Sequence, residues 1–146
     1  MKAILSLVFL FSTSLVIGQA AFPASWVGDW SGQLEIFTAT GKVQEIPMEL
    51  HIHPLDTLPG GYTFSIIYGE DKVAGLRAYE LHTVDAAKGR YLMDEKNSIK
   101  MEAYFVNGKL IQWFEVEGSL LYTTTELVGE ELHWEIVSGS ATPVST

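Results

Sequence analysis

The 146-residue sequence predicts an all-β protein, an antiparallel up-and-down meander barrel of about 8–10 strands. Two observations predict this fold. About nine short segments between Trp30 and Val137 alternate apolar and polar residues with a period of two, and a tight turn closes almost every segment. Barrels of this size either pack solid or enclose one small ligand.

The first 20 residues predict a cleavable secretory signal peptide. Lys2 supplies a positive charge, residues 3–17 form an apolar run, and Gly18 and Ala20 are small residues of the kind that a signal peptidase reads. The run is shorter than the ~20 residues of a bilayer span, although an uncleaved membrane anchor is the alternative. No cysteine is available for a lipid anchor. We therefore expect cleavage after Ala20 and a secreted or periplasmic protein.

The rest of the chain predicts one domain over residues 21–137 and a flexible tail over 138–146 that is rich in small and polar residues. Without Lys2 the mature chain carries 8 basic and 18 acidic side chains, a formal charge of −10. This charge disfavours nucleic acid and anionic membranes as partners. The chain has no cysteine, so the core depends on apolar packing alone.

Five segments alternate cleanly, and three more place polar and apolar groups on both faces. The clean segments are residues 30–36, 46–52, 62–68, 99–105 and 132–136, and the mixed ones are 76–84, 110–116 and 121–127. Asn107-Gly108 is the strongest hairpin signal, because both residues tolerate positive φ. Two longer Gly-rich connections, 54–61 and 69–75, are expected to emerge together at one mouth of the barrel.

Gly28-Asp29-Trp30 resembles the Gly-x-Trp signature that opens lipocalins and other calycins. The resemblance implies an up-and-down barrel whose base is closed by a short turn, with Trp30 packed beneath it. Two features depart from true lipocalins: no Arg or Lys follows Lys109 to cover that Trp, and no Thr-Asp-Tyr motif lies between the middle strands. The resemblance is therefore to a calycin-like, secreted bacterial branch.

The inward aromatic rows and the meander predict a barrel that binds a small, mostly apolar or amphipathic molecule. Arg77 and Tyr79 share one face of their strand and could hold a ligand carboxylate, although an outward Arg77 paired with an acid is the alternative. The predicted ligand-lining residues are Trp30, Phe64, Tyr68, Arg77, Tyr79, Met101, Phe105, Trp113 and Trp134. The alternatives are a filled barrel that serves as an envelope interaction module, and a small barrel enzyme of isomerase or cyclase type.

Catalytic and metal signatures are sparse. The sequence has no nucleophile elbow, phosphate loop or HExxH motif, and Glu80 is the best candidate acid. His51 and His53 have a spacing that β-sheet metal sites use, but their strand face also carries Glu45 and Glu49 and reads as solvated outer surface. We therefore predict no catalytic residue, no metal and no other cofactor.

Overall fold

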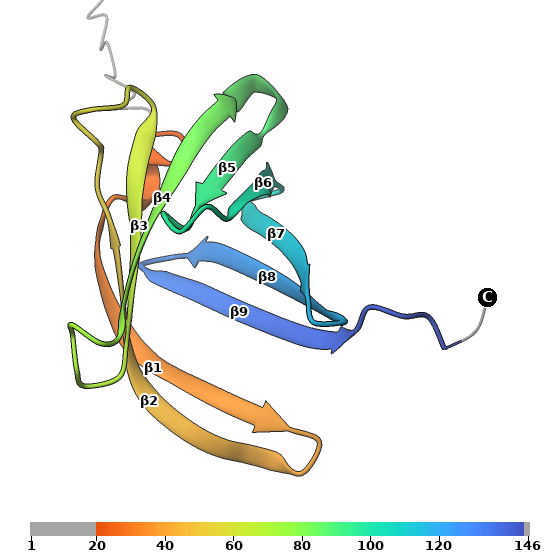
Figure 1. Ribbon diagram of the computed structural model, residues 1–146. Helices are drawn as coiled ribbons and strands as arrows, with labels where there is room; N and C mark the ends of the chain where they lie inside the picture. Colours follow the sequence, from red (N-terminus) through yellow and green to blue (C-terminus); the bar gives the residue numbers. More distant parts are fainter. Residues whose placement is uncertain (1–19, 145–146) are drawn as a thin grey trace, which may run out of the picture.

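The structure is a computed structural model, and residues 20–144 are described here. They form one antiparallel sheet of nine strands in the order β1-β2-β3-β4-β5-β6-β7-β8-β9, which curls into a nearly closed barrel (Figure 1). The predicted meander barrel is confirmed. The predicted signal peptide spans residues 1–20, and residues 1–19 lie outside the described residues. The elements are η1 (Ala24–Trp26), β1 (Gly28–Thr38), β2 (Gly41–Ile52), β3 (Gly61–Tyr68), β4 (Leu76–Asp85), η2 (Ala86–Lys88), β5 (Arg90–Asp94), β6 (Lys100–Val106), β7 (Lys109–Val116), β8 (Ser119–Val128) and β9 (Glu131–Ser140).

Two hairpins owe their tightness to residues with positive φ. Asn107 and Gly108 have φ angles of 50° and 77°, and Glu117 and Gly118 have 49° and 77°. Such pairs give the two-residue turn whose twist matches that of the strands it joins. The predicted Asn-Gly hairpin is therefore present between β6 and β7, and a second one of the same kind joins β7 to β8.

The two longer connections do not share one mouth, so that expectation is wrong. Residues 53–60 join β2 to β3, and residues 69–75 join β3 to β4. In an antiparallel meander, successive connections lie at opposite ends of the sheet, and Figure 1 shows the two loops far apart. We call the end where β1 begins the closed end and the other the open end.

The closed end is plugged by the segment that precedes β1. Trp26, the last residue of η1, is 2% exposed. The Phe22 ring stacks on Phe105 with centroids 4.0 Å apart, and its edge contacts with Trp26 and Tyr91 span 4.6 and 5.0 Å. The buried tryptophan beneath the barrel is thus Trp26. Trp30, which the calycin resemblance placed there, donates its indole N–H to the Trp26 carbonyl oxygen at 3.0 Å.

The core lies between the inner faces of the strands and is densest toward the closed end. Its fully buried side chains come mainly from β2 to β7 and include Phe64, Ile52, Leu81, Met93 and Leu110. β9 contributes Leu132 at the margin of this core, Trp134 is half-buried, and residues 135–140 are exposed. β9 continues to Ser140, into the segment expected to be a tail, because residues 138–140 pair with β8.

Candidate ligand-binding site

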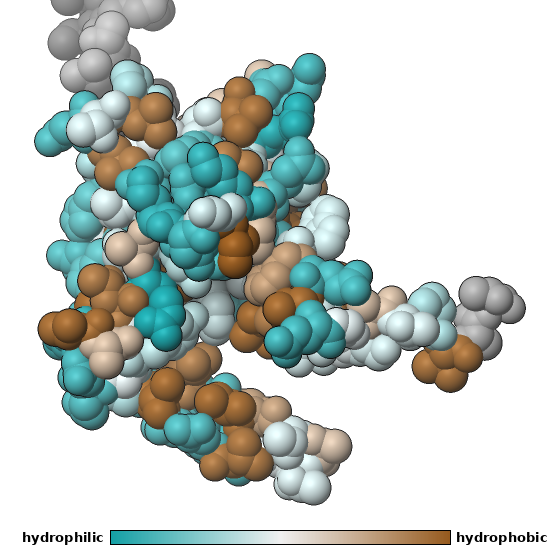
Figure 2. All heavy atoms as spheres, in the orientation of Figure 1, coloured by the Kyte–Doolittle hydropathy of each residue, from teal (hydrophilic) through white to brown (hydrophobic). Residues whose placement is uncertain are grey.

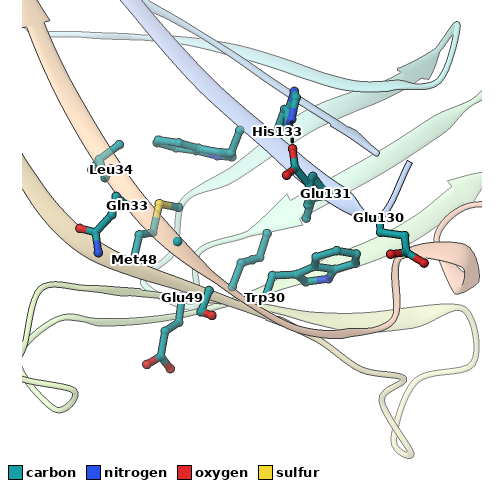
Figure 3. Close-up of a pocket in the computed structure, with 13 residues that line it drawn as sticks. Trp30, Gln33, Leu34, Met48, Glu49, Glu130, Glu131 and His133 are labelled. Atoms are coloured by element: carbon teal, nitrogen blue, oxygen red, sulfur yellow. Dashed lines mark hydrogen bonds and ion pairs between the residues drawn. The ribbon is translucent and has the colours of Figure 1, made fainter. Parts of the chain in front are cut away.

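The barrel has an open seam between its first and last strands. β1 pairs only with β2 and β9 only with β8 within residues 20–144, so the two strands leave facing edges. A groove of about 450 Å³ occupies this seam (Figure 3). It is lined by Trp30, Ser31, Gly32, Gln33 and Leu34 of β1, by Met48, Glu49 and Leu50 of β2, by Glu130 of the β8–β9 turn, and by Glu131, Leu132, His133 and Trp134 at the start of β9.

The β1 wall is apolar because of strand alternation. Trp30, Gly32 and Leu34 share the inner face, and Met48 is the cross-strand partner of Gly32. A Cβ atom built on Gly32 would have no neighbour within 4 Å. In Figure 3, Trp30, Leu34 and Met48 lie in the space between the β1–β2 ribbon and β9. Because Gly32 has no side chain, there is open space between the large apolar side chains of Trp30 and Leu34.

The opposite wall combines apolar and acidic groups. Leu132 and Trp134 are half-buried and face the inner side, whereas His133 contacts Glu131 through Nε2 and Oε2 at 3.1 Å. Glu130 and Glu131 add carboxylates beside the groove, whereas the Glu49 side chain points to the outer face of the sheet, where its carboxylate contacts His51 and Lys72. The lining contains no Lys or Arg. This charge distribution favours a neutral or cationic molecule over an anion.

The seam continues as a wider groove of about 890 Å³ toward the open end. The two grooves share Gln33, Leu34 and Trp134 as lining residues, so they adjoin each other along the seam. Figure 2 shows apolar residues along the β1–β2 hairpin, across a hollow from β8 and β9. The wide groove is lined by Gln33, Leu34, Glu35, Ile36, Phe37, Tyr68, Trp134, Glu135, Ile136, Val137 and Ser138.

The structure brings only some of the predicted lining residues to the seam. Trp30 and Trp134 line the first groove, and Tyr68 and Trp134 line the second. Burial, together with the nearby Tyr79 hydroxyl, raises the pKa of Tyr68 to about 12, so this phenol stays neutral in the groove.

The other predicted residues lie elsewhere. Phe64 and Met101 are core residues, and Tyr79 and Phe105 pack against that core. Arg77 is exposed and donates to the carbonyl oxygens of Ala74 and Leu76, outside both grooves. The exposed Trp113 stacks on Tyr104 with centroids 5.5 Å apart.

Sequence reasoning missed Gly32, Leu34, Met48 and Leu132 as lining residues. Each belongs to an inward alternating row that the sequence displays. What distinguishes these residues is that they lie next to the seam between β1 and β9. The alternation of apolar and polar residues does not reveal where that seam lies.

Two side-chain clusters could hold a metal ion within residues 20–144. One consists of Asp29, His51 and His53, and the other of Glu80, His82 and Asp94. Glu80, the candidate acid, has a pKa below its ordinary value, chiefly because His82 Nε2 lies 2.9 Å from its carboxylate. Glu80 is therefore ionised near neutrality and is a poor proton donor there.

Comparison with protein-family models, curated proteins and solved structures found no significant match. Within residues 20–144, no helix has the length and apolar character needed to cross a membrane.

Proposed function

We propose that this protein is an exported, calycin-like carrier that binds a small, mostly apolar molecule in the seam between β1 and β9. The observation that carries the proposal is the groove itself. Its volume of about 450 Å³ lies within the range of ~300–1,000 Å³ typical of small-molecule sites. Two indoles and several aliphatic side chains line it, and such surfaces gain free energy when an apolar ligand removes them from water.

The rim chemistry refines the ligand class. Carboxylates of Glu130 and Glu131 lie beside the groove, and the guanidinium of Arg77 lies outside it. A ligand with a neutral or positively charged polar end fits this rim better than the carboxylate considered from sequence. The predicted signal peptide supports export, and Gly28-Asp29-Trp30 with the meander supports the calycin resemblance.

The test begins with protein expressed from the full sequence and purified gently from its host. Native and denatured masses are compared, and the purified protein is titrated with the neutral fluorophore N-phenyl-1-naphthylamine. A small mass lost on denaturation, or saturable fluorophore binding that quenches tryptophan emission, supports the proposal. Failure to retain or bind any small molecule, including components of a host lipid extract, overturns it.

A second candidate function is strand addition by a protein partner. Within residues 20–144, the facing edges of β1 and β9 pair with no other strand, and exposed Phe37, Ile136 and Val137 lie beside them. A peptide that paired with either edge would add a polypeptide-sized mass and would slow amide exchange in β1 or β9. A small ligand adds only its own mass, so the same mass measurement separates the two functions.

A further inference from the structure

The outer face of the β1–β2 pair brings two imidazoles and one carboxylate together. Asp29 is the cross-strand partner of His51, and His53 follows two residues later on the same face. Asp29 Oδ1 lies 2.6 Å from His51 Nδ1 and 2.7 Å from His53 Nε2. We propose that Asp29, His51 and His53 form a binding site for a divalent transition-metal ion, with Zn²⁺ as the best match.

The donor set and spacing fit this ion. Zn²⁺ is commonly bound by histidine nitrogen and carboxylate oxygen, and three protein ligands leave a fourth position for water. The three donor atoms lie within 4.8 Å of one another. Tetrahedral bonds of ~2.0–2.1 Å place ligand atoms roughly 3.3 Å apart, so a small outward turn of the exposed Asp29 side chain would admit the ion.

A supporting residue lies on the far side of one imidazole. His51 Nε2 lies 3.0 Å from Glu49 Oε2, and Lys72 donates to the other Glu49 oxygen at 2.6 Å. Histidine ligands usually donate their second ring N–H to a carboxylate, which fixes the tautomer and the ring orientation. With Nε2–H donated to Glu49, the lone pair of His51 Nδ1 is directed at the site.

The second cluster is less suited to a metal ion because its carboxylates already have cationic partners. Lys96 Nζ lies 3.2 Å from Glu80, and Lys100 Nζ lies 3.4 Å from Asp94. Within residues 20–144, Asp29 contacts no lysine or arginine. His82 of the second cluster therefore provides a matched control for the first.

The test is calorimetric titration of Zn²⁺ into metal-free protein expressed from the full sequence. Wild type and His82→Gln are expected to bind one equivalent, and Co²⁺ is expected to give the visible absorption of a low-coordinate site. His51→Gln and His53→Gln are expected to weaken Zn²⁺ binding by more than the ~10–100-fold typical of a lost supporting residue, and Glu49→Gln by about that amount.

Circular dichroism in EDTA checks that each variant folds. His53 is the more exposed of the two histidines, so His53→Gln decides the question even if His51→Gln misfolds. The proposal is overturned if wild type binds no Zn²⁺ at 1 mM, if His53→Gln binds as wild type does, or if His82→Gln loses the ion.

Discussion

Replacement of Gly32 by leucine should close the seam groove while leaving the fold intact. Gly32 lies in β1 between Trp30 and Leu34, opposite Met48, and lines the groove. A Cβ at this position meets no atom within 4 Å, so the larger side chain would extend into the groove. Strand residues other than glycine also restrict the unfolded chain, which stabilises a compatible fold by roughly 0.4–1 kcal/mol.

The expected loss of ligand affinity follows from the added atoms. A leucine side chain has four carbons, and the space that they fill can no longer hold ligand carbons. Each ligand methylene that is no longer buried costs about 0.8 kcal/mol of binding free energy. A ligand that loses four such contacts binds roughly 3 kcal/mol more weakly, which is about a hundredfold change in Kd. A ligand that binds elsewhere in the barrel would keep its wild-type affinity.

The assay is fluorescence titration with N-phenyl-1-naphthylamine, alongside urea unfolding of each variant. Gly139→Leu is the matched control, because Gly139 is also a strand glycine with open space around its Cβ but lies outside both grooves. We expect weaker binding for the Gly32 variant alone and unchanged or higher stability for both. Wild-type affinity in a folded Gly32→Leu protein would show that the seam is not the binding site.

Three further predictions concern the stability of the barrel. Trp26→Ala should lower the free energy of unfolding by about 3–5 kcal/mol in urea titrations, since the indole plugs the closed end, and a loss below 1 kcal/mol would contradict that role. Gly75→Ala should cost about 1–3 kcal/mol, because its Cβ would lie 2.0 Å from the Tyr68 carbonyl oxygen; stability equal to wild type would disprove this clash. His51 has a folded-state pKa raised by Asp29, so in EDTA its stabilising contribution is complete below pH ~6.5 and is lost as the pH rises through the folded pKa. Wild type should therefore lose more thermal stability than His51→Gln between pH 6 and pH 8, and parallel losses would refute the linkage.

The strands could be predicted from sequence because each carries its own evidence. Period-two alternation marks both faces of a strand, and positive-φ residues such as Asn107 and Gly108 mark the turns. In a meander each strand pairs with the strands before and after it in the chain, so the order of strands in the sheet is the order in the sequence. Alternation does not report whether the first and last strands meet. That depends on how far the hairpins at the open end splay, which is a property of the whole sheet.

The position of the candidate groove therefore lay beyond sequence reasoning. The aromatic residues predicted as lining were chosen as inward and large, and most of them are spread through the barrel. Phe64 and Met101 lie in the core, whereas most residues that line the groove belong to β1 and β9, each of which pairs with only one strand within residues 20–144. The same argument applies to the tryptophans: motif resemblance selected Trp30, but the preceding turn of η1 carries Trp26 into the buried position.

The cluster of Asp29, His51 and His53 could not be predicted from sequence spacing alone, because its third member depends on how β1 pairs with β2. The pair His51 and His53 is visible in the sequence, but the third donor lies 22 residues earlier, and only the pairing of β1 with β2 places Asp29 opposite His51. A slip of one residue would turn Asp29 inward and bring Trp30 to the outer face. The same alternation separates the groove at Gly32 from the cluster at His51, because they face opposite sides of one two-stranded ribbon. Gly32→Leu should thus leave Zn²⁺ binding unchanged and His53→Gln should leave fluorophore binding unchanged, with additive effects in the double variant.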